Sequence, residues 1–267
     1  MTLDLFDKRA LLFLPASNPR AITHARESGA DIVILDLEDA VKPEDKDSAR
    51  EAAIAAIAEP WPMPVAIRVN ASGTQWHGPD VVAVMHRKPE LVVVPRVESK
   101  DDLGFVRNQT GLPVLAMVET AKGVLKAGTF AHEAAGLIAG TNDLAASLRL
   151  PQGAGRAPLQ MALQSIVLAA RAEGIAVFDG VYNQLDDLNG FAAEAAEGRK
   201  LGFDGKSLIH PSQIAPCHEA YAPTEGELAR AERLVAAATG GAERFEGEMI
   251  ERMHVESAER LLARYRR

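Results

Sequence analysis

Short runs of consecutive apolar residues alternate along the chain with longer segments whose apolar residues recur at helical spacing. Eight of these runs predict strands, at residues 11–15, 31–37, 65–70, 91–95, 114–118, 137–140, 175–179 and 203–209. The apolar residues occupy consecutive rather than alternate positions, which is typical of parallel strands covered on both faces.

The segments between the runs predict helices, among them residues 48–58, 159–172 and 188–201, the last followed by Gly202 as a C-terminal stop. Repeated strand–helix units imply parallel pairing through right-handed crossovers. Eight such units predict a closed (β/α)8 barrel of the TIM type rather than an open sheet. A doubly wound sheet is disfavoured, because the turn at residues 14–18 lacks the glycines of that fold.

The pattern changes after the eighth run. Residues 224–238 have amphipathic helical spacing, Gly240 and Gly241 indicate a hinge or turn, and residues 253–267 predict a second helix. We therefore predict a catalytic barrel over residues 1–221 and a C-terminal helical extension over residues 222–267. A barrel does not need this extension, which makes it a candidate lid or subunit contact.

Composition and charge narrow the possible functions. A length of 267 residues with 47% hydrophobic and 25% charged residues suits one globular barrel. The net charge of −8 argues against a nucleic-acid partner, since phosphate binding needs a basic surface. The single cysteine excludes an intrachain disulfide. No apolar run approaches the roughly 18 residues of a membrane span, and no basic-then-apolar leader opens the sequence, so we expect a cytoplasmic protein.

Polar residues follow the predicted strands at the end where such a barrel assembles its active site. Glu119 and Asp143 follow the fifth and sixth runs, on neighbouring strands roughly 4.8 Å apart. Two carboxylates held together repel each other and raise a pKa, whereas Mg²⁺ binds one or two carboxylates and completes its shell with water and substrate oxygens. Two interpretations stay open: a magnesium site, or an ion pair of Glu119 with Arg68 or Lys122.

Arg68, in the third run, is a natural clamp for an anionic substrate, because guanidinium binds a carboxylate through two hydrogen bonds and stays charged. The alternative is an ion pair with Glu38 or Asp39 on the adjacent strand, and both roles are compatible. Lys206 lacks the apolar surroundings that would make it a nucleophile. His210 is expected as a structural turn residue.

Six motifs, in chain order, resemble the citrate lyase β-subunit-like proteins of the HpcH/HpaI aldolase/citrate lyase family. They are LLFLP at 11–15, ILDLEDAV at 34–41 with PEDK at 43–46, IRVN at 67–70, MVETA at 117–121, GTNDL at 140–144 and IHPSQ at 209–213. Their agreement in order makes the resemblance specific for the family but not for the substrate.

The resemblance implies a Mg²⁺-dependent carbon–carbon lyase that splits a 3-hydroxyacyl-CoA thioester of the malyl-, citramalyl- or citryl-CoA type into acetyl-CoA and a 2-oxoacid. Carried over by position, Glu119 and Asp143 bind Mg²⁺, and Arg68 and Glu119 contact the substrate. Glu38 and Asp39 support the metal's water shell and the placement of Arg68.

The resemblance also implies that Lys46 and Arg20 contact CoA phosphates, and that the C-terminal tail reaches a neighbouring subunit of a homotrimer. In relatives, a lid aspartate within Met-Val-Asp-x-Pro acts as a base on the neighbouring subunit. Residues 249–253 read MIERM here, so Glu251 takes that position without the proline. The extra methylene displaces the carboxylate by about an ångström, an error of a size that affects catalysis.

Two rival functions stay open at this point. One is a metal-dependent aldolase on free oxoacids such as pyruvate, without CoA. The other is a non-catalytic barrel that binds an acid or assembles with other enzyme subunits.

Overall fold

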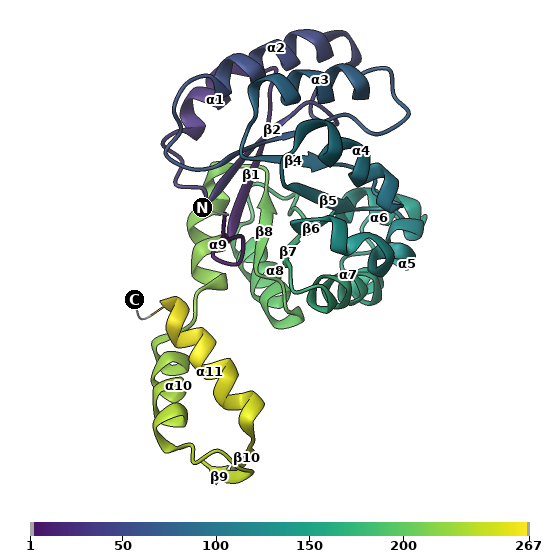
Figure 1. Cartoon of the computed structure of the whole chain (residues 1–267). Helices are drawn as coiled ribbons and strands as arrows, with labels where there is room; N and C mark the ends of the chain where they lie inside the picture. Colours follow the sequence, from purple (N-terminus) through teal and green to yellow (C-terminus); the bar gives the residue numbers. More distant parts are fainter. Residues whose placement is uncertain (1–2, 266–267) are drawn as a thin grey trace. The chain divides into compact units, whose positions relative to one another are not determined.

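The computed structural model describes residues 3–265, which form two compact units divided after Tyr221. In the first unit, eight parallel strands close into a barrel in chain order, with β8 pairing back onto β1 (Figure 1). The strands are β1 (Ala10–Pro15), β2 (Ile32–Asp36), β3 (Val65–Arg68), β4 (Leu91–Val94), β5 (Val114–Val118), β6 (Gly136–Ala139), β7 (Ala176–Asp179) and β8 (Gly205–Leu208). The predicted (β/α)8 barrel is confirmed, and each predicted strand end lies within two residues of the observed end.

Helices surround the barrel (Figure 1). They are α1 (Pro19–Ala25), α2 (Lys46–Ile57), α3 (His77–Arg87), α4 (Lys100–Thr110), α5 (Ala121–Phe130), α6 (Thr141–Ser147), α7 (Gln160–Ala172), α8 (Leu188–Leu201) and α9 (Ile214–Tyr221). Helix α8 has the predicted bounds, and Gly202 ends it with a φ of 102°, a left-handed conformation that glycine adopts without strain.

Strand side chains alternate between the barrel interior and the layer beneath the helices. On β2, Ile32 and Ile34 belong to the interior cluster, whereas Val33 and Leu35 pack in the outer layer. Both layers are buried, which explains why the strands appear in the sequence as continuous apolar runs. The alternation places Asp36 on the interior face, where it lines a cavity.

The second unit has its own small core. Helices α10 (Glu225–Ala237) and α11 (Arg252–Tyr265) pack together, with a hairpin of β9 (Glu243–Phe245) and β10 (Glu248–Ile250) between them in the chain. The core consists of Ala231, Leu234, Phe245, Ile250 and Ala258. Both predicted helices are present. The last two residues of the predicted helix 253–267 lie outside the described residues, and the hairpin was not predicted.

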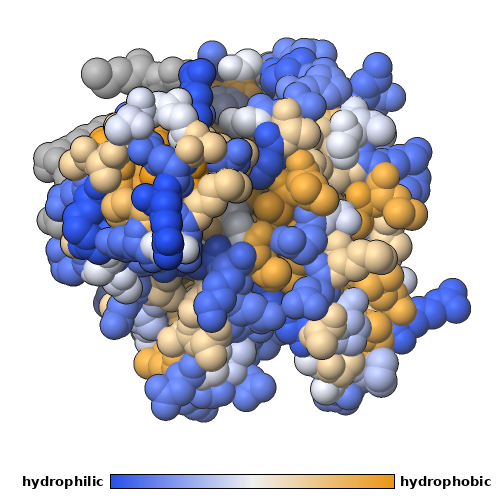
Figure 2. Space-filling model, turned by 90° about the horizontal axis from the view of Figure 1, so that it is seen from below, coloured by the Kyte–Doolittle hydropathy of each residue, from blue (hydrophilic) through white to orange (hydrophobic). Residues whose placement is uncertain are grey.

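Polar and apolar side chains share the molecular face shown in Figure 2. Among the described residues, no helix is both long and apolar enough to span a membrane. Several large apolar side chains are nevertheless exposed on the neighbouring helices α5 and α7: Leu125, Met161 and Leu168.

Candidate active site

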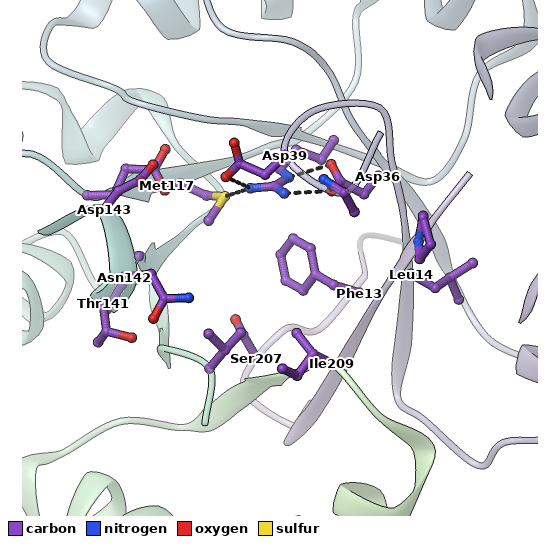
Figure 3. Close-up of a pocket in the computed structure, with 17 residues that line it drawn as sticks. Phe13, Leu14, Asp36, Asp39, Met117, Thr141, Asn142, Asp143, Ser207 and Ile209 are labelled. Atoms are coloured by element: carbon purple, nitrogen blue, oxygen red, sulfur yellow. Dashed lines mark hydrogen bonds and ion pairs between the residues drawn. The ribbon is translucent and has the colours of Figure 1, made fainter. Parts of the chain in front are cut away.

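A cavity of about 390 Å³ opens at the carboxyl ends of the barrel strands (Figure 3). Its lining consists of Phe13, Leu14, Pro15, Asp36, Asp39, Ala40, Arg68, Met117, Glu119, Ala139, Gly140, Thr141, Asn142, Asp143, Val181, Ser207 and Ile209. Barrels of this kind assemble their active sites at this end, because loops there can change without disturbing the barrel.

Arg68 is held on the cavity wall by Asp36. These residues end β3 and β2 and are Cα partners in the strand register. Arg68 Nε and Nη2 donate to Asp36 Oδ1 and Oδ2, each over 2.6 Å. The remaining nitrogen, Nη1, lies 3.1 Å from Glu38 Oε2 and 3.6 Å from Asp39 Oδ2. The predicted pairing with Glu38 and Asp39 is therefore present, but Asp36 is the principal partner.

Asp36 was not among the predicted site residues, although it holds both Arg68 and the loop after β2. Its carboxylate also accepts the backbone N–H groups of Glu38, at 2.8 Å, and Ala40, at 2.9 Å. Burial lowers the pKa of Arg68, but the charge and hydrogen bonds of Asp36 outweigh this effect and raise that pKa above its ordinary value. The sequence held one indication of its role. Side chains alternate between the two faces of a strand, so Asp36 shares the inward face of β2 with Ile32 and Ile34.

Glu119 and Asp143 lie on a second wall of the same cavity. Glu119 directly follows β5, is 2% exposed, and accepts the Arg96 backbone N–H at Oε1 over 2.6 Å. Asp143 lies in the first turn of α6, with Arg96 Nη1 at 3.8 Å. Lys122 binds Glu98 at 2.7 Å instead of Glu119, so the alternative Glu119–Lys122 pair does not form.

Gly140 makes room for the Glu119 carboxylate. A Cβ atom at Gly140 would overlap both Cβ and Oε2 of Glu119. Position 140 therefore requires glycine for a packing reason, and the GTND motif that follows β6 provides the space in which Glu119 lies beside Asp143. The motif therefore contributes to the site in two ways: Gly140 leaves space for the Glu119 side chain, and Asp143 supplies a carboxylate.

The carboxylates of the cavity are hard to ionise together. Burial raises the pKa of Glu119 to about 7, with Arg68 opposing the shift and Asp143 adding to it. Burial likewise raises the pKa of Glu38 to about 8, against the opposing charge of Arg68. Burial and the charge of Asp39 raise the pKa of Asp143. A cation placed among these groups would reverse the shifts, because it favours the charged forms.

The donor set fits a hard divalent cation. Within residues 3–265, no group of three or more His, Cys, Asp or Glu residues forms a ready metal cage. Mg²⁺ needs no such cage, since it takes one or two protein carboxylates and keeps several water or substrate oxygens. Glu119 and Asp143 provide that number, and burial raises the pKa of both, so a cation beside them would favour their ionised forms.

The two residues predicted to contact CoA phosphates, Lys46 and Arg20, lie in different environments. Lys46 is buried, and its ammonium donates to Leu37 O at 2.8 Å, Glu38 O at 2.7 Å and Asn70 Oδ1 at 2.6 Å. All three of its N–H donors thus tie together the loops after β2 and β3, which leaves none for a CoA phosphate in this arrangement. Arg20 is exposed in the first turn of α1.

Glu251 belongs to the second unit, between β10 and α11, where its backbone N–H donates to His254 Nδ1 at 2.9 Å. In the first unit, the structure brings together five predicted residues that share one cavity corner: Arg68, Glu38, Asp39, Glu119 and Asp143.

A separate buried ion network lies on the outer face of β7 and β8. Lys206 donates to Asp179 at 3.1 Å and to Glu194 at 2.7 Å, and Arg156 donates to Asp179 at 2.8 Å. The network joins the strands to helix α8, and none of its members lines the cavity. Lys206 is therefore structural, in agreement with the sequence, and His210 accepts Ser212 N–H as the predicted turn residue.

Comparisons with known proteins agree with the motifs and the fold. The chain matches a family model described as HpcH/HpaI aldolase/citrate lyase over residues 9–211. It is 36% identical over 267 residues to a (3S)-malyl-CoA thioesterase of Cereibacter sphaeroides, covering 96% of this chain and 94% of that protein. It is 33% identical over 282 residues to citrate lyase subunit β of Escherichia coli, covering 96% and 93%.

A solved structure is similar over nearly the whole chain. It is the protein CitE from Mycobacterium tuberculosis in complex with magnesium, acetoacetate and coenzyme A, which is 33% identical, has a TM-score of 0.87, and covers 98% of this chain and 100% of that one. The citrate lyase β subunit from the same organism, complexed with oxaloacetate and magnesium, matches with a TM-score of 0.75 over 83% of this chain and 100% of that one, at 33% identity.

Proposed function

Because the chain belongs to the HpcH/HpaI aldolase/citrate lyase family, we propose that it is a Mg²⁺-dependent lyase that splits a 3-hydroxyacyl-CoA thioester into acetyl-CoA and a 2-oxoacid. The prediction of a carbon–carbon lyase is confirmed at the level of the family. The observation that carries the proposal is one cavity in which Glu119, Asp143 and Arg68 converge.

Glu119 and Asp143 are the residues we assign to the metal, because both carboxylates line the cavity, and the magnesium in the similar CitE structure supports Mg²⁺ as the ion. Bound Mg²⁺ supplies Lewis-acid polarisation of the oxoacid oxygens. Gly140 keeps the Glu119 carboxylate in the cavity, and the Arg96 N–H fixes one of its oxygens at 2.6 Å. Both contacts reduce the reorganisation that ligand binding demands of Glu119.

Arg68 is the residue we assign to the negative charge of the substrate. Asp36 immobilises two of its nitrogens, and Phe13 and Met117 pack against the guanidinium, at 5.4 Å from the ring centre and 3.7 Å from the sulfur. A fixed cation in a partly water-excluded cavity stabilises charge that develops on the enolate or carboxylate oxygens as the carbon–carbon bond breaks. Glu38, beside Arg68, supports its placement.

The charges of the cavity favour a substrate whose oxoacid half has one carboxylate. Among the described lining residues, Arg68 is the sole cation. A second carboxylate would face Asp39 and Glu119, or an apolar wall that includes Val181 and Ile209, with no further basic side chain in the described lining. Arg96, outside the lining, is paired with Asp143 at 3.8 Å. We therefore favour malyl- or citramalyl-CoA, which yield glyoxylate or pyruvate, over citryl-CoA, which yields oxaloacetate.

We propose that the CoA part of the substrate binds to exposed residues outside the cavity. Arg20, just beyond β1, is proposed as a contact for CoA phosphates, whereas Lys46 is proposed to position the loops. The second unit is proposed as a lid that provides Glu251 to a neighbouring subunit of a homotrimer. The exposed apolar residues of α5 and α7 support self-association, because such surface favours burial between subunits.

Thioester hydrolysis is a second candidate, because a relative at 36% identity is a (3S)-malyl-CoA thioesterase. Incubation with malyl-, citramalyl- and citryl-CoA, followed by product separation, distinguishes the possibilities. Lyase activity yields acetyl-CoA and an oxoacid, and hydrolysis yields free CoA and a hydroxyacid. A parallel incubation with free oxoacids completes the test: turnover of these alone indicates the aldolase, and no turnover of any substrate with Mg²⁺ bound indicates a non-catalytic barrel.

A further inference from the structure

Ser207 has a buried hydroxyl without a partner at the cavity wall. The residue lies on β8, is 2% exposed and lines the cavity. Its Oγ forms no hydrogen bond with any residue of the described chain, 3–265. Figure 3 shows the side chain in the cavity near Asn142 and Ile209, with the hydroxyl oxygen directed into the space bounded by Phe13.

The inward direction follows from strand geometry. Lys206 joins the ion network beneath α8, and Leu208 packs in the outer layer, so the residue between them faces the barrel interior. An unpaired buried hydroxyl is unfavourable for folding, and alanine at this position would avoid the penalty. A serine here therefore needs a reason other than the stability of the protein alone.

The surrounding wall offers the hydroxyl no partner. Phe13, Met117 and Ile209 contribute apolar side chains to the lining. The nearby Asn142 amide is engaged, because it exchanges hydrogen bonds with Asn183 at 2.7 and 3.2 Å. The Ser207 proton thus remains available to an acceptor that enters the cavity.

We propose that Ser207 Oγ donates a hydrogen bond to an oxygen of the bound 2-oxoacid, and so acts as an additional substrate-binding residue. The identity of the ligand rests on the proposed function, whereas the unpaired hydroxyl does not. The hydrogen bond forms only with the ligand in place. Ser207 consequently strengthens substrate binding while it lowers the stability of the protein alone, a combination expected at functional sites.

The test compares Ser207→Ala, Ser207→Thr and a matched control, Ser165→Ala. Ser165 is half-buried on α7, outside the cavity lining, and donates to Met161 O within its own helix. Calorimetric titration of the Mg²⁺-saturated proteins with pyruvate, and thermal unfolding without pyruvate, give the two readouts. Ser207→Ala should weaken pyruvate binding about fivefold, the effect of one neutral hydrogen bond. It should leave Mg²⁺ affinity unchanged and the melting temperature equal or higher, and threonine should restore binding.

Three results would overturn the proposed role of Ser207, and the third would also overturn the proposed function. Unchanged pyruvate affinity in Ser207→Ala overturns this inference alone. Weaker binding together with a lower melting temperature also overturns it, because both then follow from lost packing. If the wild-type protein binds Mg²⁺ but none of the oxoacids pyruvate, glyoxylate and oxaloacetate, the inference and the proposed function fall together.

Discussion

Asp36 and Arg68 form a bidentate ion pair at the carboxyl ends of β2 and β3, with both hydrogen bonds at 2.6 Å. The side chains of both residues are buried, with exposures of 1% and 8%. The pair fixes two of the three guanidinium nitrogens and leaves Nη1 beside Glu38. The orientation of the proposed anion clamp is therefore set by a residue that also shapes the loop after β2.

Replacing Asp36 by asparagine should destabilise the protein and disorder the clamp. The amide nitrogen cannot accept the hydrogen bonds that the carboxylate receives, and Arg68 loses its principal countercharge in a buried place. A broken buried pair typically costs about 3 kcal/mol of unfolding free energy. Urea unfolding measures this loss. Asp39→Asn is the control: its side chain is 62% exposed and 3.6 Å from Arg68, so less than about 1 kcal/mol is expected. Equal losses in both variants would refute the special role of Asp36.

Replacing Gly140 by alanine should abolish Mg²⁺ binding while the barrel stays folded. The added methyl group would overlap the Glu119 side chain and displace its carboxylate. Gly128→Ala is the matched control, because that helical glycine of α5 has no atom within 4 Å of an added Cβ and gains about 0.5–1 kcal/mol of helix stability. Titration with Mg²⁺ and circular dichroism give the two readouts. Wild-type Mg²⁺ affinity in Gly140→Ala would contradict the assignment of Glu119 as a ligand.

The raised pKa values predict that Mg²⁺ stabilises the protein more at high pH. The pKa of Glu119 is raised from 4.5 to about 7 in the folded protein. Its protonated form therefore stabilises the fold below about pH 4.5, and this contribution disappears as the pH rises through about 7. Mg²⁺ binds the ionised form, so its affinity should be about tenfold weaker at pH 6 than at pH 8.

Thermal unfolding with and without Mg²⁺ at both pH values tests this dependence. The increase in melting temperature caused by Mg²⁺ should be larger at pH 8. In Glu119→Gln, the protein without metal should be at least as stable as wild type at pH 8, and Mg²⁺ should have little effect at either pH. A Mg²⁺-induced increase that is the same at both pH values would contradict the pKa argument.

Glu251→Gln should lower turnover by about 100-fold if Glu251 is the base, the usual contribution of a general base. Glu259→Gln, an exposed change on helix α11, which begins directly after Glu251, is the control and should behave like wild type. Co-expression of Glu251→Gln with Glu119→Gln tests action between subunits, because in the proposed trimer mixed assemblies would restore some complete sites. Light scattering that shows a monomer, or no recovery in the mixed protein, would count against a base supplied by the neighbouring subunit.

Strand periodicity was sufficient to predict the barrel, because parallel strands buried on both faces give continuous apolar runs. It was also sufficient to place Glu119 and Asp143 at one end of the barrel. The β9–β10 hairpin was missed since each of its strands has only three residues, most of them partly or fully exposed. Such short segments have no reliable period.

The parts of the site that sequence could not predict depend on pairing across the barrel. Asp36 lies inside an apolar run, so its partnership with Arg68 becomes visible only through the β2–β3 register. Lys46 was expected at CoA phosphates, and its inward ammonium depends on loops that come together only in the fold. Whether Ser207 is paired likewise depends on every neighbouring side chain in three dimensions.

The most direct test of the central claim is acetyl-CoA release from malyl- and citramalyl-CoA by wild-type protein, Glu119→Ala and the exposed control Glu173→Ala. We expect release by the wild type and Glu173→Ala with Mg²⁺, loss of release with EDTA, and none from Glu119→Ala at any Mg²⁺ concentration. Citryl-CoA should be the poorest of the three thioesters. Wild-type release that persists in EDTA or in Glu119→Ala would contradict a Mg²⁺-dependent lyase built on Glu119.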